Sequence, residues 1–155
     1  MEIVFNDVTY KENVKTPLEK TYLKKVSFMI EDNKITSIIG NTSSGIDVIG
    51  DLISIIKTPT SGSIRVFEYV NDGRRIKNIN KLRMNIGYVK SDVDKMLFNK
   101  TVKDELSFGV KYFKYKINKQ EIRVKEALKL VNLDEEYLNK NVSDLTFEEK
   151  KKVSL

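Results

Sequence analysis

The chain has 155 residues, the size of one domain, and its hydrophobic content of 40% is enough for a core. It has no cysteine, which excludes a disulfide framework and any thiolate metal or redox site. The net charge is +6, and no run of about 18 apolar residues predicts a membrane span. No basic and apolar leader opens the sequence, so we expect a cytoplasmic protein.

Strands and turns alternate around one helix in the first half of the chain. Short β-rich apolar runs are separated by clusters of turn residues, and one segment has apolar residues at helical spacing. The predicted strands are Leu23–Ile30, Ile35–Ile39 and Ser63–Val70, the turns are Glu31–Lys34 and Pro59–Gly62, and the helix is Val48–Ile56. A strand, a loop and a helix therefore follow one another from Ile35 to Ile56.

A glycine-framed loop joins the second of these strands to the helix. It consists of Gly40, Asn41, Thr42, Ser43, Ser44, Gly45, Ile46, Asp47 and Val48. Phosphate-binding loops read Gly, four residues, Gly, Lys, then Ser or Thr. Their backbone N–H groups cradle the phosphates, the Lys neutralises them and the hydroxyl holds Mg²⁺. Both glycines are present here, but Ile46 replaces the lysine and Asp47 replaces the hydroxyl.

The charge of Asp47 decides how much binding the loop retains. A carboxylate about 4 Å from a phosphate, at an effective dielectric near 20, costs on the order of 4 kcal/mol, or about three decades of affinity. Asp47 can offset part of this by ligating Mg²⁺ directly, because carboxylate oxygen suits that ion. Two interpretations stay open, a weakened site for ATP and Mg or a plain turn between strand and helix, and we favour the turn.

A hinge is predicted between two parts of the chain. Residues 1–89 form the β-rich part with the loop, residues 90–155 are mainly helical from Thr101 onward, and Lys90–Lys100 connects the two. Apolar residues at helical spacing are expected in the core of the second part, namely Phe108, Val110, Phe113 and Ile117.

Two sequence patterns predict helix starts by a capping box. In this motif a Ser, Thr or Asn side chain and a Glu three residues later exchange hydrogen bonds with backbone N–H groups. The two pairs are Asn118 with Glu121, before a helix at Ile122–Val131, and Thr146 with Glu149.

The chain resembles the ATP-binding subunits of ABC transporters, most closely those of the energy-coupling-factor class. The matching segments are Ile3–Tyr10 and Leu23–Phe28 as the first strands, Lys57–Ile64 after the first helix, and Leu97–Gly109, Val124–Val131 and Leu133–Leu138 in the helical subdomain. The resemblance implies an α/β fold, a partial P-loop NTPase core of the ABC ATPase type. It would have an N-terminal β subdomain and a helical subdomain and lack the C-terminal half. ATP and Mg are the implied cofactors of the loop.

The functional positions of that family are changed in this chain. By the resemblance, the adenine-stacking aromatic falls at Glu12, the Mg²⁺-sensing glutamine at Ser91 and the Leu-Ser-Gly-Gly-Gln signature at Leu145–Glu149. The sequence ends at Leu155, before the family's second acidic strand motif, its catalytic glutamate and its switch histidine. We therefore expect no catalytic residue, no metal-ligating residue and no ATPase activity of the chain alone.

The same ending affects the predicted sheet. In the family, strands equivalent to Ile35–Ile39 and Asn85–Val89 pair with strands of the C-terminal half. Two apolar strands without partners are expected, and such edges promote association. Three outcomes stay open: the chain is a fragment or decayed remnant, another polypeptide completes the sheet, or the strands pair again in a smaller arrangement.

The family's docking region is better preserved than its nucleotide loop. Leu97, Phe98, Thr101 and Val102 stand at matching places, so the resemblance implies docking to a membrane-embedded transporter subunit, beside a companion ABC ATPase, on the inner face of the cell membrane. The alternatives are the ATP-binding half of a heterodimeric ATPase, a nucleic-acid or protein binding module, and a decayed remnant. Lysines and aromatics alternate at Lys111–Lys116, but no nucleic-acid motif accompanies them, which disfavours nucleic acid as a partner.

Overall fold

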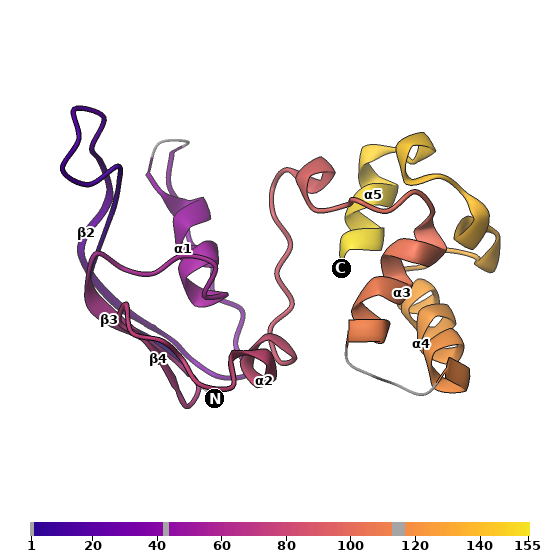
Figure 1. Cartoon of the computed structure of the whole chain (residues 1–155), viewed down its shortest axis with the longest axis horizontal. Coiled ribbons are helices and arrows are strands. Elements are labelled where there is room, and N and C mark those ends of the chain that lie inside the picture. Colours follow the sequence, from indigo (N-terminus) through magenta and orange to yellow (C-terminus); the bar gives the residue numbers. More distant parts are fainter. Residues whose placement is uncertain (1, 42–43, 113–116) are drawn as a thin grey trace. The chain divides into compact units, whose positions relative to one another are not determined.

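The computed structural model describes residues 2–41, 44–112 and 117–155. The chain divides into two compact units, a β-rich one at Met1–Tyr88 and a helical one at Val89–Leu155 (Figure 1). This division lies one residue before the predicted one. Within the described ranges, no helix is both long and apolar enough to cross a membrane.

An antiparallel sheet of four strands forms one layer of the β-rich unit, in the order β2-β1-β3-β4. The strands are β1 (Ile3–Glu12), β2 (Lys20–Ile30), β3 (Ser61–Val66) and β4 (Tyr69–Asn71). Phe5 of β1 lies opposite Phe28 of β2, with ring centroids 4.4 Å apart, and opposite Ile64 of β3. The predicted strands at Ile3–Tyr10 and Leu23–Ile30 are confirmed, and both are longer in the structure.

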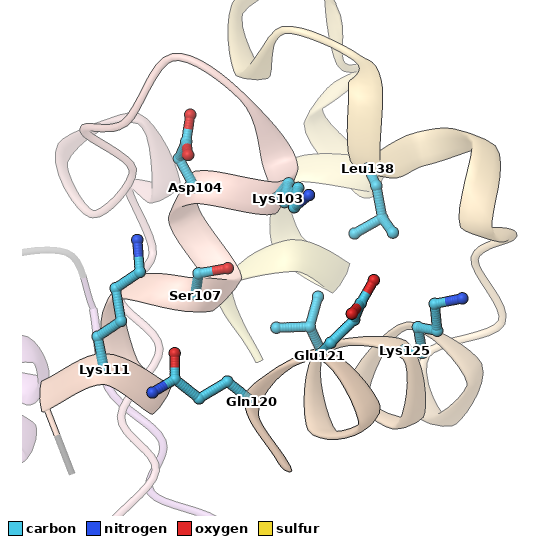
Figure 2. Close-up of a pocket in the computed structure, with 9 residues that line it drawn as sticks. Lys103, Asp104, Ser107, Lys111, Gln120, Glu121, Lys125 and Leu138 are labelled. Carbon is cyan, nitrogen blue, oxygen red and sulfur yellow. The ribbon is translucent and has the colours of Figure 1, made fainter. Parts of the chain in front are cut away.

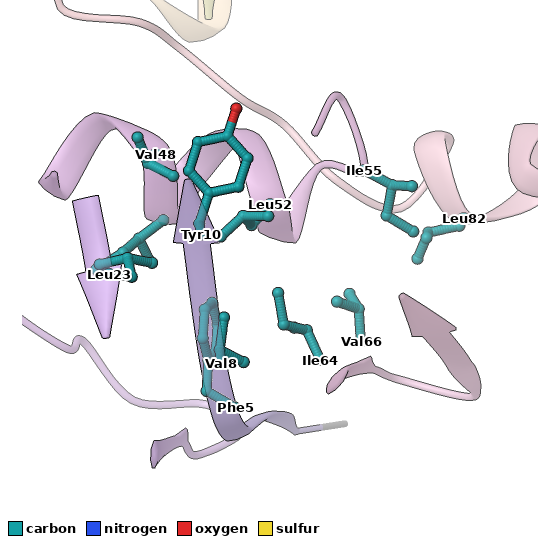
Figure 3. Packing of buried hydrophobic residues seen from close by; sticks show 11 residues of the cluster. Phe5, Val8, Tyr10, Leu23, Val48, Leu52, Ile55, Ile64, Val66 and Leu82 are labelled. Carbon is teal, nitrogen blue, oxygen red and sulfur yellow. The ribbon is translucent and has the colours of Figure 1, made fainter. Parts of the chain in front are cut away.

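Helix α1 (Ile46–Ile53) packs against this sheet and closes the core (Figure 3). The buried residues are Phe5, Val8, Tyr10, Leu23, Ile64 and Val66 from the strands, Val48, Ile49 and Leu52 from α1, Ile55 after it, and Leu82 from the short helix α2 (Ile79–Arg83). α1 ends three residues before the predicted end at Ile56. The reason is that Ile55 adopts φ 54° and the N–H of Ile56 turns back to the Asp51 carbonyl at 2.8 Å.

Two predicted strands are absent. Ile35–Ile39 and Asn85–Val89 are irregular, and the side chains of Ile35 and Ile39 are 100% and 93% exposed. A strand needs a neighbour for its backbone hydrogen bonds, and no strand in the described part of the chain pairs with either segment. The prediction of a single strand at Ser63–Val70 is also wrong, because a turn with Phe67 at φ 56° separates β3 from β4.

The helical unit has its own core. Its described elements are η1 (Val93–Lys95), α3 (Val102–Tyr112), α4 (Ile117–Leu130), η2 (Glu135–Asn139), η3 (Val142–Asp144) and α5 (Phe147–Ser154). The buried residues are Val102, Leu128, Leu133, Val142, Leu145 and Val153. The start of α3 is tied to the segment before α5, since the N–H of Val102 donates to the Lys140 carbonyl at 3.1 Å. The prediction that this part is mainly helical is confirmed.

One predicted capping box is confirmed and the other is wrong. At the start of α5, the Thr146 hydroxyl accepts from the N–H of Glu149 at 3.3 Å, and the Glu149 carboxylate accepts from the N–H of Thr146 at 2.7 Å. Asn118 lies inside α4, which begins at Ile117, so it does not precede the helix. Residue propensity alone placed that helix start too late.

The prediction that Phe108 belongs to the helical core is also wrong, because its side chain is 51% exposed. The buried stripe of α3 starts at Val102 and continues at Leu106, and Phe108 falls off this stripe at helical periodicity. Val110 is half-buried. Phe113 and the side chain of Ile117 lie outside what the structure describes.

Candidate nucleotide loop and docking face

The glycine-framed loop leads directly into α1. Gly45 is the N-cap of this helix and has φ 80°, in the left-handed region that favours glycine. A Cβ atom on Gly45 would lie 3.1 Å from the Tyr22 carbonyl oxygen, so the loop rests on β2. The N–H and the hydroxyl of Ser44 both donate to the Asn41 carbonyl, at 3.0 and 2.6 Å, and hold the turn. The described part of the loop thus keeps a tight backbone frame.

A hollow of about 320 Å³ adjoins the loop. Its lining residues are Gly40, Asn41, Gly45, Ile46, Asp47 and Val48 from the loop, with Lys20 and Tyr22 from β2, whereas Thr42 and Ser43 lie outside the described residues. Lys20 is the one cation in this described lining, and its Nζ lies 4.7 Å from the centre of the Tyr22 ring. Sequence reasoning missed Lys20, because only the hairpin of β1 and β2 brings it to the loop.

The two replaced side chains both border this hollow. Asp47 is exposed in the first turn of α1, where a carboxylate interacts favourably with the helix dipole by about 0.3–1 kcal/mol. A bound phosphate would need the same N-terminal amides and the same positive end. Ile46 supplies no charge to compensate, so the loop is suited to starting a helix and lacks the groups that stabilise a transferring phosphoryl.

Glu12, where the sequence resemblance places the family's adenine-stacking aromatic, is part of an ionic cluster. Lys57 Nζ lies 2.8 Å from the Glu12 carboxylate and 3.5 Å from that of Asp51. The hydroxyl of Tyr10 donates to Glu12 at 3.2 Å, and that of Tyr88 donates to Asp51 at 3.1 Å. The hydrogen bond from Lys57 lowers the pKa of Glu12, while burial and the charge of Asp51 raise the pKa of Tyr88 to about 12. Glu12 therefore has no ring that could stack on a base, and its carboxylate is engaged by Lys57 and Tyr10.

The start of α5, where the sequence resemblance places the family's signature, is occupied by its own capping interactions. The Glu149 carboxylate accepts from the Tyr137 hydroxyl at 2.6 Å as well as from the N–H of Thr146. These hydrogen bonds, with that from Tyr137 first, lower the pKa of Glu149 to about 2. The negative charge of Glu149 therefore lies at the start of α5, where a bound anion would need free N–H groups and no competing carboxylate.

The predicted docking residues are only partly available on the surface. Phe98 is 65% exposed and meets Phe108 edge-on, with ring centroids 4.8 Å apart. Leu97 and Thr101 are half-buried. Val102 is fully buried in the helical core and has no surface to offer, so its inclusion among the docking residues is corrected. Phe108, which its helical spacing predicts to lie in the core, joins Phe98 on the surface instead.

A second hollow, of about 260 Å³, separates α3 from α4 (Figure 2). Its lining has mixed charge: Lys103, Asp104 and Lys111 come from α3, and Glu121 and Lys125 from α4. Lys125 is already paired with Glu135 of η2 at 2.7 Å. No group of three or more metal-ligating side chains occurs among the described residues. The hollow assembles no catalytic set from these groups.

The sheet, the glycine loop leading into α1 and the separate helical unit define the fold of an ATP-binding cassette. The sequence profile of the ABC transporter family matches residues 23–155, and the chain belongs to this family. It superposes on the dimeric bacterial ABC transporter cassette MJ0796 with TM-score 0.84 and 22% identity, covering 98% of this chain and 66% of that one. CbiO1 of Clostridium perfringens, part of the ABC transporter complex CbiONQ, gives TM-score 0.78 and 29% identity over 98% and 58% of the two chains.

Energy-coupling factor transporter ATP-binding proteins are among the relatives. EcfA3 of Oenococcus oeni is 36% identical over 158 residues, and EcfA2 of Spiroplasma kunkelii is 31% identical over 157 residues. These alignments cover 100% of this chain but 54% and 52% of the two relatives. The chain thus spans about half the length of the curated relatives it matches. The family resemblance and the ABC ATPase-like α/β fold predicted from the sequence are confirmed.

Proposed function

We propose that this chain serves as an ABC transporter ATP-binding subunit of the energy-coupling-factor type that has no ATPase activity of its own. It acts as a non-catalytic partner in a membrane transport complex. Its place is the cytoplasmic face of the membrane, against a membrane-embedded transporter subunit and beside a companion ABC ATPase.

The observation that carries this proposal is the first turn of α1. Asp47 occupies the positive end of the helix, and Ile46 stands where the family has its phosphate-binding lysine. Phosphoryl transfer depends on positive charge at this point, so the chain is expected to bind Mg-ATP weakly or not at all.

The docking role is supported by the exposed pair of Phe98 and Phe108. Large aromatic side chains that remain exposed in a folded unit are frequent anchors of protein interfaces. CbiO1 is described as part of a transporter complex, and the sequence resemblance places the family's coupling region at the Leu97–Gly109 segment of this chain. We expect Phe98, with Leu97 and Thr101 at its sides, to contact the membrane subunit.

A second candidate function is the ATP-binding half of a heterodimeric ATPase completed by its partner. It is favoured by the retained left-handed conformation of Gly45 and by Lys20, a cation beside the loop. In that case the companion subunit would supply the groups that this chain lacks.

Phosphate release by the purified chain tests the loss of activity. We expect no turnover above that of a matched preparation of the Gly45→Asp variant, in which an added Cβ would lie 3.1 Å from the Tyr22 carbonyl oxygen and the left-handed backbone would be strained. Turnover that is present in the unmodified chain and absent from Gly45→Asp would contradict the proposal. Turnover in a mixture with a companion ATPase that exceeds the turnover of the companion alone, and that is lost when Gly45→Asp replaces the unmodified chain, would favour the second candidate.

A further inference from the structure

We infer that Glu105 is a positioning residue that fixes the turn Leu97–Asn99, called here the docking turn, so that Phe98 stands on the surface against Phe108. This inference rests on the docking role proposed above. It adds a residue that does not itself belong to the exposed aromatic pair, since Glu105 acts through the backbone of the docking turn.

One carboxylate oxygen of Glu105 accepts three hydrogen bonds from the docking turn. The donors are the N–H of Phe98 at 3.1 Å, the N–H of Asn99 at 2.7 Å and the Nδ2 of Asn99 at 3.0 Å. Hydrogen bonds to an ionised carboxylate are about twice as strong as those between neutral groups. Two consecutive peptide units are thereby held against α3 by one side chain.

This tie explains how Phe98 keeps its place while it is mostly exposed. With 65% of its surface in solvent, the ring gains little from burial, and among the described residues the ring that it contacts is that of Phe108. Glu105 and Phe108 are three residues apart on α3 and therefore share one side of the helix. The same helix face thus holds the backbone of Phe98 through Glu105 and supports its ring through Phe108.

The docking turn is also connected to α5 at its other end. Lys150 of α5 lies 2.7 Å from the carboxylate of Asp94 in η1, and the N–H of Leu97 donates to the Val93 carbonyl at 3.3 Å. A hollow of about 500 Å³ adjoins the docking turn, and its lining includes Asp94, Phe98 and Lys150. The turn is therefore fastened on both sides, and the Glu105 tie is the one next to the aromatic pair.

The test compares three variants of the full chain. Glu105→Ala removes the acceptor, Glu105→Gln keeps an oxygen acceptor without the charge, and Glu135→Ala is the control. Glu135 forms an ion pair with Lys125 in the same unit and does not touch the docking turn. Circular dichroism verifies that all three fold.

Amide hydrogen exchange at Phe98 and Asn99 is the direct readout. For Glu105→Ala we expect exchange at these two amides to accelerate by at least about tenfold, with loss of the nuclear Overhauser contact between the two rings. Glu105→Gln should restore most of the protection, and Glu135→Ala should leave both signals unchanged. Equal acceleration throughout the unit in Glu105→Ala, or unchanged protection, would overturn the inference.

Association with the membrane subunit separates this inference from the docking proposal. Both predict that Phe98→Ala weakens association, and only the inference predicts that Glu105→Ala does so as well, with rescue by Glu105→Gln. If Phe98→Ala has no effect, the docking proposal fails, whatever the exchange data show. If Phe98→Ala weakens association and Glu105→Ala does not, the inference alone fails.

Discussion

At the scale of single residues, our proposal assigns the loss of nucleotide chemistry to Ile46 and Asp47. Both border the hollow beside the glycine loop, and the described backbone of that loop retains the left-handed Gly45. The loss of function is therefore expected to come from two side chains and not from the path of the backbone. Substitution of these two side chains is therefore expected to restore nucleotide binding.

The double substitution Ile46→Lys with Asp47→Ser should restore measurable binding of Mg-ATP. The lysine supplies the missing attraction, and removal of the carboxylate relieves a repulsion of at most about 4 kcal/mol, which the exposure of Asp47 reduces. Titration calorimetry is the measurement, with Ile46→Leu as a control that changes no charge. Tight binding by the unmodified chain, or no binding by the double variant, would count against this account.

Asn71 of β4 is expected to hold the end of α1. It is fully buried, and its Nδ2 donates to the Leu52 carbonyl at 3.1 Å and to the Lys57 carbonyl at 2.9 Å. Asn71→Leu leaves both carbonyls without this donor and should destabilise the protein by about 2–4 kcal/mol. Urea unfolding measures the change. The exposed Asn6, changed to Leu in the same way, should alter stability by less than about 0.5 kcal/mol, and equal effects of both variants would refute the role of Asn71.

At the scale of elements, the start of α5 carries a pH dependence of known sign. Because the folded pKa of Glu149 is about 2, below its ordinary value of 4.5, its interactions stabilise the folded state above about pH 4.5. That contribution is lost as the pH falls from 4.5 toward 2.

The variant Tyr137→Phe should raise the pKa of Glu149, since it removes the hydrogen bond that lowers this pKa most. A carbon-13 NMR titration of the side-chain carboxyl groups measures this shift directly. Tyr69→Phe in the β-rich unit provides the comparison and should leave the value unchanged. The same titration midpoint in all three proteins would show that the Tyr137 contact is not formed in solution.

Elements with local signals could be predicted from the sequence. The capping box of Thr146 and Glu149 lies within one turn of helix, and the glycines of the loop mark a backbone turn that any strand-to-helix connection would need. Ile35–Ile39 has an equally good local pattern but forms no strand, because a strand depends on a neighbour that the pattern does not contain. The turn at Phe67 was missed because a positive φ at a phenylalanine has no sequence signature.

Site residues were predicted only where the family motif names them. Lys20 reaches the loop through the pairing of β2 with β1, and Glu105 reaches the docking turn through the folding of the chain back onto α3. Neither contact follows from spacing along the sequence. Phe108 shows the same limit, because its helical spacing indicated a core position and the packing of α3 turned it to the surface.

At the scale of the whole molecule, the β-rich unit carries the glycine loop with Ile46 and Asp47, and the helical unit carries the exposed pair of Phe98 and Phe108. The chain spans about half the length of its curated relatives, yet both units have compact cores of their own. A protein of this kind is useful to a transporter only if it still reaches the membrane subunit. We therefore propose above all that the chain docks to the membrane subunit without hydrolysing ATP itself.

Affinity purification from detergent-solubilised membranes of the host tests that claim most directly, with tagged unmodified chain, Phe98→Ala and Leu130→Ala. Leu130 is 84% exposed in the same unit and is not part of the docking turn, so it controls for loss of an exposed apolar side chain. A membrane-embedded transporter subunit should be recovered with the unmodified chain and with Leu130→Ala. Recovery with Phe98→Ala should fall at least about fivefold, as expected for an anchor worth roughly 1–2 kcal/mol. Equal recovery with all three proteins, or recovery of nucleic acid in place of any membrane subunit, would contradict the account.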